Sequence, residues 1–176
     1  MSPDLMKQAL MGVFAALVIV AALKDLTSYT IPNWISAVLA LAFLPAALLM
    51  GAEPLQIAIA VGVGFGMLVL GVVMFALRWL GGGDAKLMAA ASLWIGLPGL
   101  APFVLCTGLV GGALALVLLA LRSAWLRPFA AAGPPWVDRL ATPGGATPYG
   151  VAIAVGALLA FQDGLIMRAA GGGFGM

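Results

Sequence analysis

Residues 80–88, LGGGDAKLM, interrupt two long apolar runs with three glycines and an aspartate. A carboxylate in such a place lies at a water boundary or has a chemical task. A second aspartate, Asp25, stands at the end of the first apolar run. Three consecutive glycines cost backbone entropy, which makes sense if another backbone must come close to Asp84. We therefore expect the fold to bring Asp25 and Asp84 together on one side of a membrane.

Lipid must be the main solvent of this chain. Of its 176 residues, 64% are hydrophobic and 8% are charged, and its mean hydropathy is +1.19, whereas soluble domains carry about 25% charged residues. The apolar runs are continuous and about twenty residues long, unlike the roughly ten-residue alternating strands of a membrane barrel. The composition predicts an all-α, polytopic membrane protein. The net charge of +2 gives no reason to expect a nucleic-acid partner.

Few residue types remain for chemistry. The sequence has no histidine and one cysteine, Cys106. This excludes a disulfide within the chain, a Cys/His zinc site and a histidine-based triad or dyad. Carboxylates, hydroxyls, lysines and one thiol are left, and Cys106 is most simply a packing residue. We expect no metal and no cofactor.

Six apolar spans are expected, and the fourth of them is short. They cover about residues 5–23, 34–50, 55–77, 84–95, 102–121 and 148–161. The third span contains Gly62 and Gly66, a GxxxG spacing that permits close helix packing. Arg78 and Trp79 follow it as an interfacial pair.

Outside the spans, residues 122–147 form the one long polar stretch, and we expect an interfacial loop there, with or without a short surface helix. The predicted organisation is a single membrane domain over residues 1–168. A glycine-rich tail over residues 169–176 is expected to be disordered.

Basic residues predict the orientation. With six spans, one side holds six of the eight lysines and arginines: Lys24, Arg78, Lys86, Arg122, Arg127 and Arg139. The other side holds Lys7 and Arg168. Because cytoplasmic loops carry the excess of Lys and Arg, the first side is expected in the cytoplasm and the N-terminus outside. Asp25 and Asp84 stay on one side even without the short fourth span, because two spans lie between them.

Each aspartate taken alone has a simple explanation. Asp25, next to Lys24, fits a polar interfacial turn, and Asp84 fits a helix N-cap behind a flexible glycine turn. Taken together they permit catalysis, because two neighbouring carboxylates in a low-dielectric site share a proton. One can act as base and the other as acid on a water that attacks a peptide carbonyl, without a metal.

At these residues the sequence resembles the prepilin peptidases (type IV leader peptidases), a family of membrane aspartyl proteases. The first matching segment, residues 25–33, reads DLTSYTIPN, and the second, residues 81–86, reads GGGDAK. The third, residues 147–154, reads TPYGVAIA and is similar to the segment that opens the last core helix of the family. The glycine-aspartate motif alone is weak in a glycine-rich chain, but the three segments in this order are specific.

The resemblance implies a membrane aspartyl endopeptidase of the cell (inner) membrane. By matched position, Asp25 and Asp84 are the catalytic pair. The expected substrates are prepilins or pseudopilins, whose leaders (class III signal peptides) are cleaved at the cytoplasmic face ahead of an apolar helix. Longer members carry a cytoplasmic insertion with paired CxxC motifs and N-methylate the product. This chain has neither feature, so we expect the short form that serves tight-adherence (Flp) pili, without N-methyltransferase activity.

Further residues of the matched segments are expected to line the site: Pro32, Asn33, Gly81, Gly82, Gly83, Lys86, Pro148, Tyr149 and Gly150. For Tyr149, a substrate contact and a plain interfacial aromatic are both open. Lys86 does not face Asp84, because residues i and i+2 of a helix point apart, and a membrane anchor is its simpler role.

Two other functions remain open. A proton-coupled small transporter or channel would use the same aspartates, although it would favour ionisable residues in mid-span, which these spans lack. A non-catalytic membrane protein of pilus assembly would use the glycine faces for packing alone. The sequence leaves the oligomeric state open.

Overall fold

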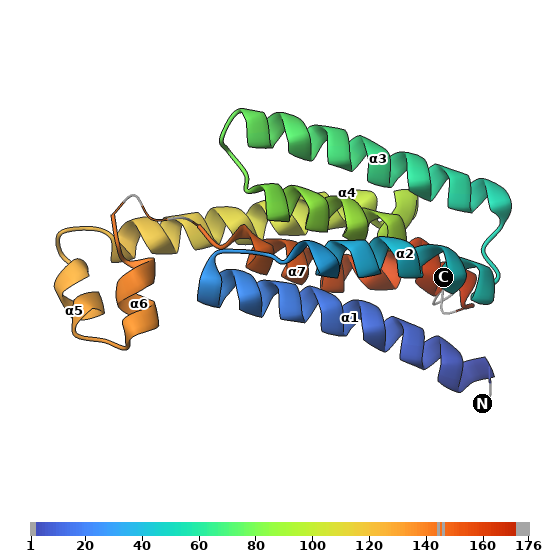
Figure 1. The fold of residues 1–176 in the computed structure, drawn as a ribbon, viewed down its shortest axis with the longest axis horizontal. Coiled ribbons are helices and arrows are strands. Elements are labelled where there is room, and N and C mark those ends of the chain that lie inside the picture. Colours follow the sequence, from blue (N-terminus) through green and yellow to red (C-terminus); the bar gives the residue numbers. More distant parts are fainter. Residues whose placement is uncertain (1–2, 144, 146, 172–176) are drawn as a thin grey trace.

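The computed structural model of the chain describes residues 3–143, 145 and 147–171, and every element among them is a helix (Figure 1). The longer helices are α1 (Pro3–Ser28), α2 (Asn33–Leu49), α3 (Pro54–Ala76), α4 (Gly82–Leu121) and α7 (Tyr149–Ala160). The short ones are α5 (Arg127–Ala131), α6 (Pro135–Leu140), the 3-10 helix η1 (Phe161–Asp163) and α8 (Leu165–Ala169). The predicted all-α class is confirmed. Of the expected tail, Ala169 belongs to α8, and residues 172–176 lie outside the described residues.

Four segments are long and apolar enough to cross a membrane: Gln8–Ser28, Pro54–Ala76, Gly82–Leu121 and Tyr149–Ala169. The helix α2 is also apolar but has 17 residues. Large apolar side chains stay exposed on these helices, such as Leu41 at 77% and Leu109 at 73%, which suits a chain whose surroundings are lipid. The chain is therefore a multi-pass helical membrane protein, and the count of six spans stays a prediction.

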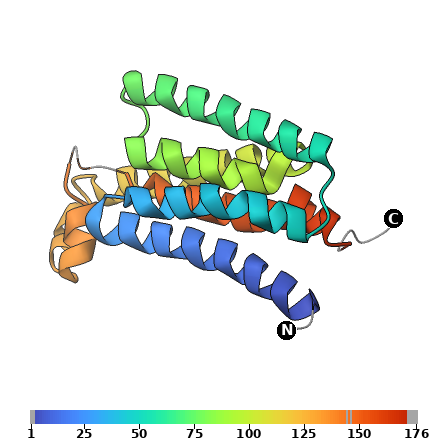
Figure 2. The same cartoon turned by 45° about the vertical axis from the view of Figure 1, so that its right-hand side comes forward.

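The helix α4 reverses direction at Gly96. This residue has φ 62° and ψ −170°, outside the helical region, and a left-handed φ is available to glycine without strain. Before the kink, Ala85 lies against Gly71 of α3. After the kink, Gly111 lies against Tyr149 at the start of α7. Both ends of α4 thus come to the same end of the bundle, with its two parts between α3 and α7 (Figures 1 and 2). This is the region where the sequence predicted two separate spans.

The predicted GxxxG contact is wrong within this chain. A Cβ atom at Gly62 or Gly66 would meet nothing within 4 Å. The close contacts of α3 are at Gly64 and Gly71 instead, where a Cβ atom would lie 2.5 Å from Leu93 Cδ2 and 2.8 Å from the Cβ of Ala85 on α4. The helix was predicted correctly but its packed face was not, because glycines at every second residue do not single out one face.

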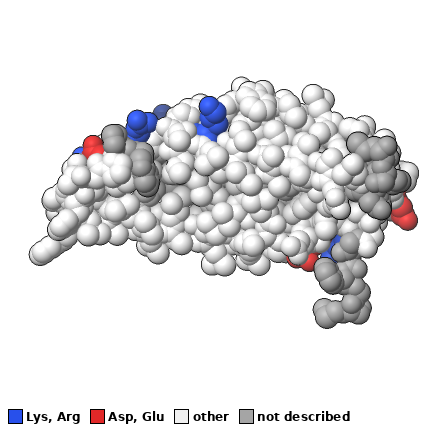
Figure 3. All heavy atoms as spheres, turned by 90° about the horizontal axis from the view of Figure 1, so that it is seen from below, with Lys and Arg blue, Asp and Glu red and all other residues white. Residues whose placement is uncertain are grey.

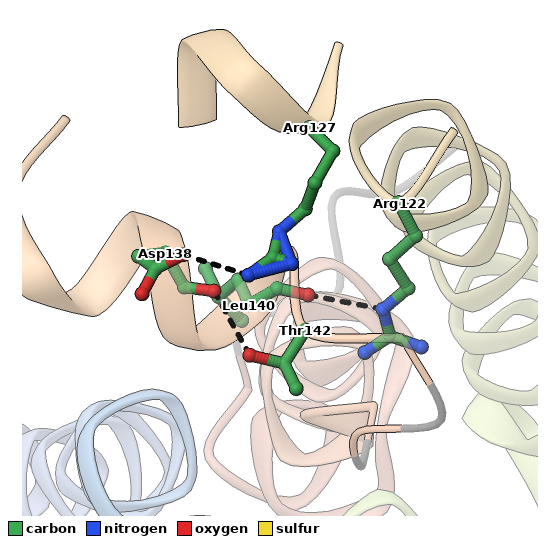
Figure 4. Close-up of polar contacts among 5 residues, drawn as sticks. All are labelled: Arg122, Arg127, Asp138, Leu140 and Thr142. Atoms are coloured by element: carbon green, nitrogen blue, oxygen red, sulfur yellow. Dashed lines mark hydrogen bonds and ion pairs between the residues drawn. The ribbon is translucent and has the colours of Figure 1, made fainter. Parts of the chain in front are cut away.

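Polar contacts join residues 122, 127, 138 and 140 of the segment between α4 and α7, which contains α5 and α6. Arg127 Nη2 and Asp138 Oδ1 form an ion pair at 3.2 Å that joins these two helices. Arg122 Nε donates a hydrogen bond to the Leu140 carbonyl at 3.0 Å, and Figure 4 shows both contacts. The predicted interfacial segment therefore contains two short helices, α5 and α6, beside the end of the bundle.

Charged side chains lie toward the ends of the molecule. On the face seen in Figure 3, Lys and Arg gather toward the end that carries α5 and α6, and a broad band without charged residues lies beyond them. Such a band matches the hydrocarbon layer of a membrane, which disfavours charged groups.

An aromatic cluster holds the middle of the bundle. Phe14 stacks on Phe161 with ring centroids 4.5 Å apart and lies 5.3 Å from the ring of Trp94. Trp94 is fully buried, and its Nε1–H donates to the Leu39 carbonyl at 2.8 Å. One side chain of α4 thereby joins α1 and α2, because Phe14 belongs to α1 and Leu39 to α2.

We expect Trp94→Ala to lower the free energy of unfolding by about 3–5 kcal/mol, the range for removing a buried aromatic side chain. Thermal unfolding of the detergent-solubilised protein measures the change. Trp125→Ala is the control, because Trp125 is 87% exposed and its loss should leave the melting temperature unchanged. Equal melting temperatures for the two variants would show that the cluster does not hold the bundle together.

Candidate active site

Asp25 is held from two sides. It lies in the last turn of α1 and is 5% exposed. Its Oδ2 accepts a hydrogen bond from the backbone N–H of Gly150 in the first turn of α7, at 2.7 Å. Its carbonyl accepts the N–H of Tyr29 at 2.8 Å. The helix therefore continues to Ser28, past the position where the sequence predicted its end, and α7 sets the direction of the carboxylate.

Asp84 is the third residue of α4 and not its N-cap as predicted, because the helix already begins with Gly82 and the N-cap is Gly81. Its carboxylate accepts a hydrogen bond from the Gly81 N–H, the reach-back typical of an acid at this helix position. The side chain is 7% exposed. Its Oδ1 is buried and has no hydrogen-bond partner among the described residues. One oxygen thus has a partner within the protein, and the other has none among the described residues.

The two carboxylates line the same two pockets. The first, here called the wide pocket, measures about 780 Å³ and is lined by Asp25, Tyr29, Phe75, Ala76, Arg78, Trp79, Leu80, Gly81, Asp84, Thr147 and Tyr149. The second, called the narrow pocket, measures about 430 Å³ and is lined by both aspartates and by residues of the 29–33 and 81–86 segments. The aspartates therefore lie where the two pockets meet.

The three glycines before Asp84 have different surroundings. A Cβ atom at Gly81 would lie 2.7 Å from Asp84 Oδ2, and one at Gly83 would lie 3.1 Å from Ile31 Cβ. A Cβ atom at Gly82 would meet only the Phe75 ring, at an ordinary 3.5 Å. Gly81 thus leaves room for the carboxylate, and Gly83 lets α4 approach the segment between α1 and α2.

We expect Gly81→Ala to slow the leader cleavage that the resemblance implies by about 10- to 100-fold, because the added methyl group displaces the Asp84 carboxylate, and a shift of about 1 Å in a reacting group has an effect of this size. Gly12→Ala in α1 is the control, because a Cβ atom there would meet nothing within 4 Å, and it should cleave at close to the wild-type rate. Conversion of a prepilin to its mature form, followed by gel mobility, measures both. Equal rates for the two variants would contradict the role given to Gly81.

The other residues predicted for the site lie around the same cleft, with one exception. Lys86 Nζ donates to Asn33 Oδ1 at 2.9 Å, which joins α4 to the start of α2. Both line the narrow pocket together with Pro32, and Tyr149 lines the wide pocket. Pro148 is fully buried instead, at the N-cap of α7.

Sequence reasoning missed several residues of the wide pocket, above all Tyr29 and Arg78. Arg78 was predicted as half of an interfacial pair with Trp79. No local pattern indicates that the end of α3 borders the aspartates. That neighbourhood arises because α3 and α4 pack against each other at Gly64 and Gly71, which brings the end of α3 beside the start of α4.

The segment 122–147 also reaches this region. Arg139 Nη1 donates to the Thr27 carbonyl at 3.0 Å. A cation suits the free carbonyls at the C-terminal end of a helix. The short helix α6 is thus attached to the last turn of α1, the turn that carries Asp25.

Within the described residues, no three His, Cys, Asp or Glu side chains come together as metal ligands.

The fold and the site define a multi-pass helical membrane protein with two buried carboxylates at one cleft. The chain belongs to the type IV leader peptidase family, which it matches over residues 12–116, a range that includes both aspartates. Comparisons with curated proteins and with solved structures gave no match. Membership implies aspartic-type protease activity, prepilin substrates and a multi-pass location in the inner membrane.

Proposed function

We propose that this protein is an aspartyl endopeptidase that removes prepilin or pseudopilin leaders at the cytoplasmic face, with Asp25 and Asp84 as the catalytic pair. The observation that carries the proposal is that both carboxylates, buried and from different helices, line one cleft. An aspartate that only faces solvent or caps a helix would stay exposed, because burying a charge is unfavourable unless the charge has a task or a partner.

The proposed reaction uses one proton shared by the pair. The ionised carboxylate takes a proton from a water, and the resulting hydroxide attacks the scissile carbonyl carbon. The protonated carboxyl gives its proton to the carbonyl oxygen, which forms a neutral gem-diol. When the C–N bond breaks, the protonated carboxyl gives its proton to the leaving amine and a gem-diol hydroxyl gives its proton to the other carboxylate, so the product is a carboxylic acid and the pair again holds one proton. Gly150 and Gly81 each fix one carboxylate oxygen, so Asp84 Oδ1 is the oxygen that we assign to the water.

An apolar pocket supports the expected position of the substrate's apolar helix. This pocket, here called the glycine pocket, measures about 330 Å³ and shares Trp79, Leu80 and Tyr149 with the wide pocket. Gly108, Gly111 and Gly112 of α4 line it as well. A peptide whose scissile bond lies at the aspartates would extend its apolar segment along these glycines, which leave room for another helix.

The proposed topology has six crossings, with the N-terminus outside and the aspartates on the cytoplasmic side. The antiparallel parts of α4 count as two crossings and α2 as one. The basic residues at the site end support this orientation.

Labelling of single cysteines tests the topology. In a Cys106→Ala background, Asp138→Cys should react with a membrane-impermeant thiol reagent only after the cells are permeabilised. Glu53→Cys, in the turn between α2 and α3 at the other end, should react in intact cells. The reverse pattern would invert the orientation and place the aspartates outside.

We further propose that the protein is the short form that serves tight-adherence (Flp) pili and does not methylate its product. Only seven residues lie between Asp25 and Asn33 (33 − 25 − 1 = 7), so there is no insertion that could hold a second active site. Mass spectrometry of a pilin matured by this protein alone should show an unmodified N-terminus. An N-terminus heavier by one methyl group would disprove this part of the proposal.

A further inference from the structure

Two helices at the site end of the bundle are followed by left-handed residues that are not glycine. Tyr29 follows α1 with φ 51°, and Arg78 follows α3 with φ 61°. In the part of the chain that the structure describes, they are the only residues other than glycine with positive φ. A side chain is strained in this conformation, which is why helices so often end on glycine there.

The same helix ending is made with glycine at the other end of the bundle. The Arg78 N–H donates to the Phe75 carbonyl, and the Trp79 N–H donates to the Met74 carbonyl, both at 2.9 Å. At Gly51, which follows α2 with φ 81°, the same two bonds measure 3.1 and 3.0 Å. Gly171 follows α8 with φ 76°. Glycine would therefore serve at position 78 as well, so the helix ending does not explain the choice of arginine there.

The guanidinium of Arg78 has no hydrogen-bond or ion-pair partner in the part of the chain that the structure describes. The other arginines each donate a hydrogen bond inside the protein: Arg122, Arg127, Arg139 and Arg168. Arg78 makes no hydrogen bond or ion pair within the described residues, although it lines the wide pocket with both aspartates. It is also the one cation among the residues that line that pocket.

We propose that Arg78 binds a carboxylate of the substrate and so positions the leader peptide across Asp25 and Asp84. A guanidinium holds a carboxylate with two parallel, charge-assisted hydrogen bonds. The next two residues, Trp79 and Leu80, line both the wide pocket and the glycine pocket. The bound carboxylate therefore lies between the scissile bond and the apolar segment of the peptide. This inference rests on the proposed function.

The test compares two synthetic peptides on wild-type protein and Arg78→Gly in phospholipid-free detergent. Each peptide has a basic leader, a glycine at the cleavage site and an apolar segment, with either Glu or Gln between the glycine and that segment. We expect Arg78→Gly to melt at an equal or higher temperature, because glycine relieves the backbone strain. The kcat/KM for the Glu peptide should fall about tenfold through KM, the size of one lost charge-assisted contact. The Gln peptide should change by less than about twofold.

A binding measurement separates this inference from the proposed function. Fluorescence anisotropy with the labelled Glu peptide gives Kd for the Asp25→Asn/Asp84→Asn protein with and without Arg78→Gly. A tenfold weaker Kd with glycine supports the role of Arg78 whether or not the wild type cleaves the peptide. Failure of cleavage with this Kd difference intact would count against the proposed protease activity alone.

Gly51→Arg is the matched control for the helix ending. It places an arginine in the same backbone conformation far from the site, so it should lower the melting temperature and leave the Kd for the Glu peptide unchanged. Equal losses for the Glu and Gln peptides, or an unchanged Kd in Arg78→Gly, would overturn the proposal. A loss seen in phosphatidylglycerol vesicles but not in detergent would also overturn it, because Arg78 would then bind lipid phosphate.

Discussion

Asp25→Asn and Asp84→Asn are each expected to leave a co-expressed prepilin unprocessed. Asparagine keeps the shape of the side chain but can neither take a proton from water nor give one to the scissile carbonyl. Loss of one general acid or base slows a reaction by about 10²–10⁴-fold, which is complete loss on the time scale of cell growth. The ratio of precursor to mature pilin, followed by gel mobility in membranes, measures it.

The control for this pair is Asp138→Asn. Asp138 is the partner of Arg127 in an ion pair at the edge of α6, so its loss should leave processing intact. Normal processing in both Asp25→Asn and Asp84→Asn would refute the catalytic assignment and favour a packing role in pilus assembly. Proton-driven uptake into vesicles that is lost in both variants, with no leader cleavage by the wild type, would favour a transporter.

Gly150→Ala is expected to have an effect nearly as large, although glycine has no chemistry of its own. A Cβ atom at this position would lie 2.9 Å from the Cβ and from the Oδ2 of Asp25, and 2.9 Å from Ile31 Cδ1. The methyl group must push the Asp25 carboxylate away from the backbone N–H that now holds it at 2.7 Å. A displacement of about 1 Å predicts a loss of about 10²-fold in the cleavage rate.

Gly62→Ala is the matched control, because a Cβ atom there meets nothing within 4 Å. Replacing a helical glycine by alanine at such an open position should raise the free energy of unfolding by about 0.5–1 kcal/mol and leave cleavage unchanged. The comparison requires that Gly150→Ala still folds, which its melting temperature in detergent reports. A folded Gly150→Ala protein that cleaves at the wild-type rate would show that α7 does not position Asp25.

The helices and the chemistry of the site were predictable to different degrees. The predicted spans 34–50, 55–77 and 148–161 agree closely with α2, α3 and α7 (Asn33–Leu49, Pro54–Ala76 and Tyr149–Ala160). The ends of these helices can be predicted because proline, glycine and polar residues interrupt continuous apolar runs. The matched segments also predicted Asp25 and Asp84 as the catalytic pair. The composition agreed with this prediction, because few other groups in the chain can do acid–base chemistry.

The packed faces were not predictable. A helix of a soluble protein shows its buried face by its apolar stripe, but these helices are apolar all round, so no stripe exists. The contacts of Gly64 and Gly71 with α4 were therefore misassigned to Gly62 and Gly66. The place of Arg78 in the wide pocket was missed for the same reason.

The sequence by itself determined the solvent, the helical class and the residues able to do chemistry, because composition and the spacing of apolar runs are local properties. It also determined that Gly81, Gly82 and Gly83 directly precede Asp84. Only the tertiary structure decided that α4 reverses at Gly96 and that the Gly150 N–H bonds to Asp25, 125 residues away. Such contacts depend on how all helices pack at once, and no short stretch of the chain encodes them.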